Sequence, residues 1–89
     1  MIRRHYVFSG HVQHVGFRWR AGRAAGMLSC TGWCRNNKDG SVTMEIQGSG
    51  LKIALVILAL RCSRRIHIMK TDTTQIPVVP GETEFLSLY

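Results

Sequence analysis

Arg18 and Asn36 are the two side chains in this sequence best suited to chemistry on an anion. Arg18 ends a run that begins at Gly10, and Asn36 precedes a turn that closes at Gly40. A guanidinium keeps its charge at neutral pH and can bind two oxygens of one phosphate. A carboxamide both donates and accepts hydrogen bonds, so it can orient a water molecule without carrying charge. The pair predicts an anion site beside a neutral amide.

The segment before Arg18 is predicted to join a strand to the start of a helix. Residues 4–9 are typical of a strand, and residues 17–28 are typical of a helix. The apolar residues of this helix recur at helical spacing and are Phe17, Ala21, Ala24, Ala25 and Leu28. Main-chain N–H groups at a helix start lack intrahelical partners and carry the positive end of the helix dipole. The loop that ends there can therefore hold an oxyanion through its backbone.

The rest of the chain predicts four further strands, one more helix and a turn. The hairpin is the clearest pattern, because Val42, Met44 and Ile46 alternate with polar residues after an Asp-Gly turn. The remaining predicted elements are a strand over 30–36, a turn over 37–40, a helix over 51–62, a strand over 66–71 and a short last strand over 85–89, after Pro77 and Pro80. This order predicts an α+β ferredoxin-like split βαβ fold, with an antiparallel sheet and two helices on one face.

Two runs of the sequence resemble the acylphosphatase signature. The matching residues of the first run are Gly10, Val12, Gln13, Val15, Phe17 and Arg18, and those of the second are Gly32, Trp33, Asn36, Gly40 and Val42. His14 departs from the pattern, because the family usually has a glycine there. The order of elements also fits the family, which implies a single acylphosphatase-like domain over residues 1–89. In this topology Arg18 and Asn36 are expected at the same edge of the sheet.

The resemblance implies metal-independent hydrolysis of acyl phosphates to a carboxylate and phosphate. The main-chain N–H groups of His14, Val15, Gly16 and Phe17, together with Arg18, would bind the phosphate of a small-molecule substrate, and Asn36 would orient the attacking water. No cofactor and no metal are expected. The five acidic residues are dispersed along the chain and predict no oxygen-ligand site for Mg²⁺. The sequence does not indicate which acyl phosphate is the physiological substrate.

Simpler interpretations remain open for each of these features. Arg18 could be a surface arginine, and Asn36 could serve only to form the turn. The net charge of +7 favours attraction of anions but also suits a solvated basic surface. A basic ferredoxin-like domain could instead bind RNA without catalysis, although Val42–Ile46 offers no aromatic stacking platform and nucleic acid is not expected. An inactive relative, or a module of a larger protein, is a third alternative.

Composition predicts a cytoplasmic protein that does not enter a membrane. Three cysteines are expected to be buried thiols, and the N-terminus lacks the apolar run of a signal peptide. The predicted second helix is apolar nearly all round but is about half as long as the ~20 residues needed to span a bilayer. Leu51, Leu55, Leu58 and Cys62 form one stripe of this helix. A monomer is expected, with a homodimer through this helix as the alternative.

Overall fold

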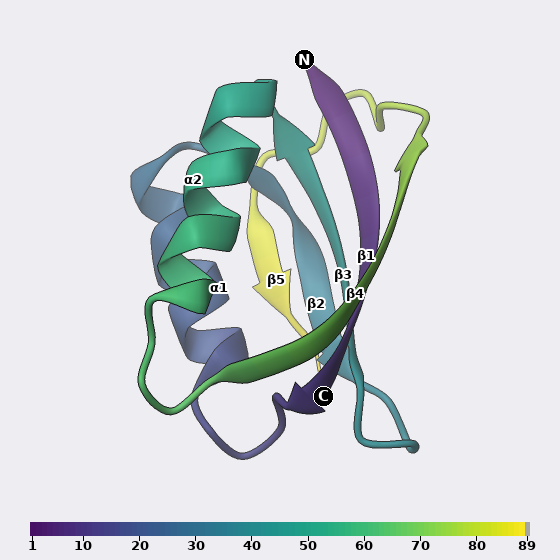
Figure 1. Ribbon diagram of the computed structural model, residues 1–89. Helices are drawn as coiled ribbons and strands as arrows, with labels where there is room; N and C mark the ends of the chain where they lie inside the picture. The colour runs from purple at the N-terminus through teal and green to yellow at the C-terminus, as the bar shows by residue number, and fades with distance from the viewer. Residues whose placement is uncertain (89) are drawn as a thin grey trace.

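The computed structural model describes residues 1–88, which form one mixed sheet and two helices (Figure 1). The strands are β1 (Ile2–His11), β2 (Thr31–Asn36), β3 (Val42–Gly48), β4 (His67–Ile76) and β5 (Phe85–Ser87). The helices are α1 (Phe17–Met27) and α2 (Gly50–Arg61). The last predicted strand extended to Tyr89, which lies outside the described residues.

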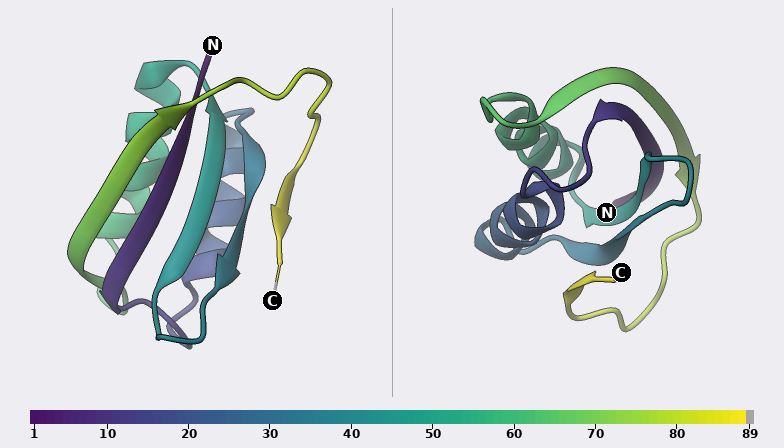
Figure 2. Two further views of the ribbon diagram at one scale, coloured as in Figure 1. Left: turned by 90° about the vertical axis from the view of Figure 1, so that its right-hand side faces the viewer. Right: turned by 90° about the horizontal axis from the view of Figure 1, so that it is seen from below.

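The strand order across the sheet is β4-β1-β3-β2-β5. β1 pairs antiparallel with both β3 and β4, and β2 pairs antiparallel with β3. Both helices cover the same face of the sheet (Figure 2). The predicted α+β ferredoxin-like fold is therefore confirmed. The short β5 adds a feature that was not predicted, because it pairs in parallel with β2 at the edge of the otherwise antiparallel sheet.

The edge strand β4 is the element whose length was most underestimated. It was predicted to end at Thr71 but continues to Ile76, paired with β1 over nearly its whole length. Most residues of β4 are exposed, so its sequence has no period-2 apolar pattern that would indicate a strand. Pairing with β1 satisfies its backbone hydrogen bonds instead. Pro77 then ends the strand, as expected of a residue without an N–H.

The core lies between the helices and the sheet. Val42, Met44 and Ile46 of β3 are fully buried beneath the helices, as their alternation predicted. α1 contributes small residues at its centre, where Ala21 and Ala25 are fully buried. Alanines at these positions let a helix approach a sheet closely, and this brings the N-terminus of α1 near the ends of the strands.

The opposite face of the sheet is partly covered as well. Residues 77–84 run from β4 at one edge to β5 at the other, past the face that the helices leave open (Figure 2). Arg3, only 2% exposed, donates from Nη1 to Glu82 Oε1 at 2.7 Å. Gln47 donates from Nε2 to the Val79 carbonyl at 3.0 Å. Both faces of β3 are therefore largely buried, because the C-terminal segment returns over the face that the helices leave open.

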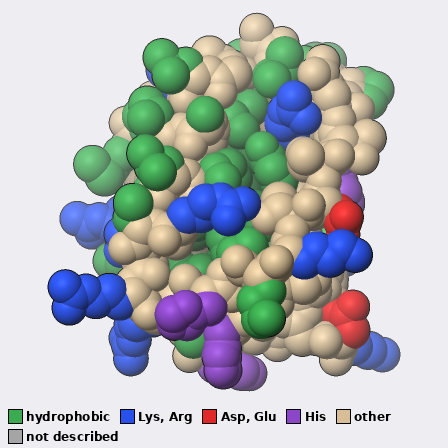
Figure 3. Space-filling view, viewed as in Figure 1, with side chains coloured by type: hydrophobic (Ala, Val, Ile, Leu, Met, Phe, Trp, Pro, Cys, Tyr) green, Lys and Arg blue, Asp and Glu red, His purple; other side chains and the backbone are tan. Residues whose placement is uncertain are grey.

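α2 divides into a buried and an exposed side. Ile53, Val56 and Leu60 face the core. The predicted stripe of Leu51, Leu55, Leu58 and Cys62 faces solvent, and Figure 3 shows apolar side chains gathered over this helix. The expectation that all three cysteines are buried was therefore wrong for Cys62, which lies at the solvent side of the helix end. Within residues 1–88, neither helix has the length and apolar character that crossing a membrane requires.

Candidate active site

The loop between β1 and α1 is shaped by close contacts on both of its sides. Gly10 has a φ of 122°, and a Cβ there would collide with the His67 carbonyl of β4, so only glycine fits. On the other side, Gln13 Nε2 donates to the carbonyl oxygens of Asn37 at 2.6 Å and Ser41 at 2.9 Å. Gln13 therefore fastens this loop to the turn between β2 and β3.

The loop ends in a helix start that no side chain caps. Gly16 occupies the N-cap position of α1 in a left-handed conformation with φ 81°, and no side chain accepts from the first turn. By contrast, Ser49 Oγ caps α2 by accepting from the Lys52 N–H at 3.2 Å. Among residues 1–88, the N–H groups of residues 14–17 find no hydrogen-bond acceptor. These donors and the positive end of the helix dipole are thus available to an anion.

His14 adopts a conformation that most side chains avoid. Its φ is 61°, in the left-handed region, where a residue with a Cβ costs about 1 kcal/mol or somewhat more relative to glycine. Histidine is one of the residues that tolerates this region best. The position where the resembling family usually has glycine is thus one whose backbone conformation favours glycine.

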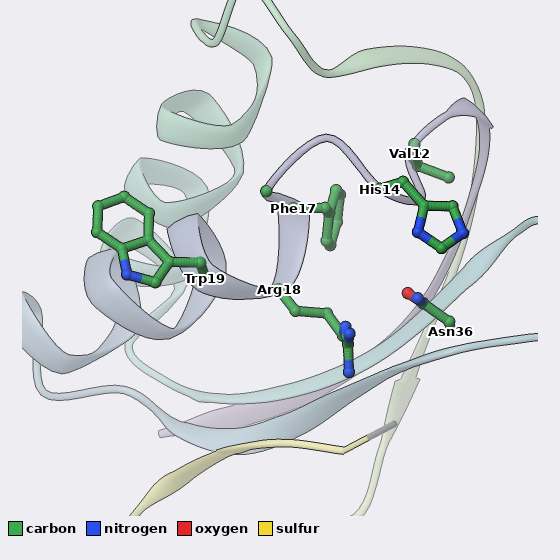
Figure 4. Close-up of a pocket in the computed structure, with 7 residues that line it drawn as sticks. Val12, His14, Phe17, Arg18, Trp19 and Asn36 are labelled. Carbon is green, nitrogen blue, oxygen red and sulfur yellow. The ribbon is translucent and has the colours of Figure 1, made fainter.

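Arg18 and Asn36 line one cavity of about 170 Å³ at the start of α1 (Figure 4). Arg18 belongs to the first turn of α1, and Asn36 is the last residue of β2, opposite Val42 in the hairpin. Arg18 Nη1 donates to the Leu88 carbonyl at 2.7 Å, which fixes one side of the guanidinium against the segment after β5. The fold thus brings together two residues that are separated in the sequence by most of α1 and β2.

Asn36 and its neighbour Asn37 have different surroundings. Asn37 Nδ2 donates to Ser41 Oγ at 3.0 Å and to Thr43 Oγ1 at 2.7 Å, so Asn37 stabilises the turn. The side chain of Asn36 makes no hydrogen bond within the described part of the chain and lines the cavity instead. The side-chain hydrogen bonds of the turn are therefore made by Asn37 and not by Asn36.

Most of the predicted site residues meet at this cavity. His14, Gly16, Phe17, Arg18 and Asn36 line it, whereas Val15 does not and packs against the core instead. Val12 and Trp19 also line the cavity and were not predicted as site residues. Val12 belongs to the first matching run, but its apolar side chain indicated only packing. Nothing in the sequence indicated Trp19 as a site residue except its position next to Arg18.

The electrostatic character of the cavity is positive. No carboxylate is among its lining residues, and Arg18 contributes a permanent positive charge. The charge of Arg18 is also felt at Cys34, a buried residue of β2. Burial raises the pKa of the Cys34 thiol to about 11, against the opposing effects of a Ser87 hydrogen bond and the Arg18 charge. Cys34 is thus a neutral core residue, and the charge chemistry of the site rests with Arg18 and the backbone.

The chain matches the family model for acylphosphatase over residues 4–86. It is 33% identical over 90 residues to an acylphosphatase of Clostridium beijerinckii, covering 100% of both chains. It is 35% identical over 95 residues to an acylphosphatase of Geobacillus thermodenitrificans, covering 100% of this chain and 96% of the other.

The crystal structure of acylphosphatase from Bacillus subtilis has the same fold, with a TM-score of 0.90, 24% identity and full coverage of both chains. The family match spans the loop, the start of α1 and the end of β2 that together form the cavity. The chain therefore belongs to the acylphosphatase family, whose members are enzymes that act on acyl phosphates.

Proposed function

We propose that this protein hydrolyses acyl phosphates without a metal ion, using the cavity at the start of α1. The phosphoryl oxygens are bound by the main-chain N–H groups of His14, Val15, Gly16 and Phe17 and by the guanidinium of Arg18. The single observation that carries the proposal is that an uncapped helix start, an arginine and an asparagine with a free amide adjoin one small cavity. A bound phosphate and a water molecule would supply hydrogen-bond partners for each of these groups.

The proposed reaction is an in-line displacement at phosphorus. The Asn36 amide holds a water molecule whose oxygen attacks the phosphorus atom, while the bond from phosphorus to the acyl oxygen breaks. The electron pair of that bond leaves with the carboxylate, and the attacking water gives up a proton as inorganic phosphate forms. Phosphoryl transfer passes through a loose transition state, so positioning and charge stabilisation supply most of the catalysis.

A neutral amide suffices as the water-orienting group because the substrate is already activated. A carboxylate leaves as a stable anion and needs no proton from a general acid, so the site can work without a titrating acid. Arg18 and the backbone donors stabilise the negative charge on the equatorial phosphoryl oxygens. These groups are already in position before the substrate binds. Such preorganised donors need little reorganisation during the reaction.

The RNA-binding alternative gains no support from the open face of the sheet. Glu45 and Glu82 lie on this face and pair with the buried Arg3. Residues 77–84 also pass over it. Trp33 also lies on this face, but the Arg35 guanidinium stands 5.5 Å from its ring centroid, so an anionic strand would meet two carboxylates and one occupied aromatic ring. The anion-binding features lie instead at the start of α1.

The proposal also concerns the molecule as a whole. We propose that residues 1–89 act as a single domain, in the cytoplasm, and as a monomer. A homodimer through the exposed leucines of α2 is the alternative, and sedimentation at several concentrations distinguishes the two. The small-molecule acyl phosphate is the only partner that the proposed mechanism requires.

The test is phosphate release from acetyl phosphate in the presence of a chelator. Arg18→Ala and Asn36→Ala are each expected to lower kcat by about a hundredfold or more, as loss of an oxyanion donor does. Arg23→Ala is the matched control, because Arg23 lies on the same helix, outside the cavity, with its guanidinium over the Trp19 ring. Unchanged turnover in both site variants would contradict the assignment, and loss of the wild-type rate on chelation would contradict metal independence.

A further inference from the structure

The imidazole of His14 has a position that the mechanism above does not use. His14 is exposed, lines the same cavity as Arg18 and Asn36, and makes no hydrogen bond to any group in residues 1–88. Figure 4 shows its ring on the side of the cavity where the Asn36 amide lies. A side chain held by a left-handed backbone, with a free ring nitrogen toward an anion site, can add a donor there.

The charged groups around His14 favour an anion as its partner. Arg18 of α1 is the only other lining residue with an ionisable side chain, and Asn36 of β2 is neutral. On the adjacent turn, Asp39 accepts from the N–H and hydroxyl of Ser41. The pKa of Asp39 is lowered by these hydrogen bonds, first by the Ser41 hydroxyl.

The ionisable groups nearest to this loop along the neighbouring elements are basic. They are Lys38 of the same turn, His11 at the end of β1 and His67 at the start of β4, the last two with ring centroids 6.5 Å apart. The carboxylates of β3 and β4 lie further along the sheet, where Glu45 is opposite His5 and Asp72 is opposite Val7. Among residues 1–88, no carboxylate lines the cavity itself to attract a protonated His14 ring away from a bound anion.

We propose that the protonated imidazole of His14 is a second side-chain ligand for the phosphoryl group, beside Arg18. The inference rests on the proposed function, because it assumes that the phosphate occupies this cavity. The protonated ring carries a positive charge and two N–H donors. The affinity of the site for a dianion is therefore expected to rise as the pH falls from about 8 to about 5.5.

The experiment measures binding of sulfate, which keeps both negative charges throughout this range, whereas phosphate itself gains a proton. Sulfate is titrated into the protein at about pH 5.5 and about pH 8, and the amide signals of residues 14–18 are followed by NMR. The wild-type protein is expected to bind sulfate about five- to tenfold more tightly at the lower pH, as one added charge near an exposed dianion would give.

Three variants isolate the His14 charge from the backbone strain at this position. His14→Gly removes both ring and strain, and His14→Gln keeps a neutral side chain, so both are expected to lose the gain at low pH. His14→Lys carries a charge at both pH values and is expected to bind sulfate about equally tightly at each. His67→Gln is the matched control for the general rise in positive charge, because His67 is exposed and lies outside the cavity. It is expected to keep the wild-type gain.

Each other outcome identifies what has failed. If His14→Gly and His14→Gln keep the gain at low pH, or if His67→Gln loses it, the inference is overturned while the anion site stands. If sulfate leaves the signals of residues 14–18 unchanged in every protein at both pH values, the anion site itself is overturned, and this inference with it.

Discussion

The proposed site is made of polar groups that find no hydrogen-bond partner within residues 1–88. Asn37 uses its amide in the turn, whereas the amide of Asn36 stays free at the cavity. Ser49 caps α2, whereas the start of α1 has no cap. Unsatisfied donors that remain solvated cost little until a ligand displaces the water, and they then bind it without rearrangement. At the scale of single residues, the proposed function rests on the Asn36 amide and the N–H groups at the start of α1.

Replacing Gln13 tests what holds the loop between β1 and α1 in place. Gln13→Ala removes the hydrogen bonds to the Asn37 and Ser41 carbonyls, which are 2.6 and 2.9 Å long, and releases the loop from the hairpin turn. We expect the free energy of unfolding to fall by about 1–3 kcal/mol. Since the loop donors would lose their alignment, kcat/KM should fall by about tenfold or more. Urea unfolding and acyl phosphate hydrolysis measure the two effects.

Gln75→Ala is the matched control for that variant. Gln75 is exposed on the edge strand β4, so its loss should leave both quantities near the wild-type values. Wild-type activity in Gln13→Ala would show that the loop keeps its shape without this fastening.

At the scale of elements, α2 shows that an all-round apolar sequence does not mean all-round burial. Its inner side is held against β3 and α1, whereas its outer leucines have no covering element in residues 1–88. The outer side therefore adds no core area, and its residues are expected to contribute little to the stability of the monomer.

A pair of alanine substitutions in α2 tests this division. Ile53 is 2% exposed and Leu58 is 54% exposed. Ile53→Ala should lower the free energy of unfolding by about 2–5 kcal/mol through lost burial and a cavity. Leu58→Ala should change it by no more than about 0.5 kcal/mol. Urea unfolding at several protein concentrations is the measurement. A large, concentration-dependent loss in Leu58→Ala would indicate that the outer side is buried in a homodimer.

At the scale of the whole molecule, buried charges connect the two ends of the chain. Arg3 of β1 pairs with Glu45 of β3 at 3.2 Å and with Glu82 of the C-terminal segment at 2.7 Å. Removing one partner from such a network leaves the other charge poorly compensated, which costs more than the pair itself contributes. The network therefore favours the single arrangement in which residues 77–84 lie over the open face and β5 reaches β2.

The Glu45 carboxylate makes the stability of the protein depend on pH. Burial acts to raise the pKa of Glu45, but hydrogen bonds from His5 and Arg3 and their charges outweigh it and hold the pKa below its ordinary value. In the unfolded chain the pKa returns to about 4.3, so the contribution of Glu45 is present above this pH and is lost as the pH falls toward the lower folded value. Thermal unfolding should show this loss between about pH 4.5 and pH 3.

Glu45→Gln is the variant that isolates this effect. It removes the titrating group, so its stability should fall less steeply with acidification than that of the wild type over the same range. Lys70 and Asp72 form an exposed pair on β4, and Asp72→Asn is the matched control that should keep the wild-type slope. Equal slopes in all three proteins would contradict the role assigned to the Arg3 network.

Local patterns were sufficient for much of the fold. The helical spacing of Phe17, Ala21 and Ala25, and the alternation of Val42, Met44 and Ile46, predicted both elements because a helix or strand repeats at a fixed period. The full extent of β4 and the parallel pairing of β5 escaped prediction, since partners distant in the chain determine both.

What the sequence by itself determined is therefore the family, through residue types, the two matching runs and the order of elements. Only the tertiary structure decided that Arg18 and Asn36 share a cavity, that Asn37 rather than Asn36 serves the turn, and that Val12 and Trp19 complete the lining. The physical reason is that a side chain's type is a local property, whereas its unused hydrogen bonds depend on the register of strands and the packing of elements that meet only in the folded chain.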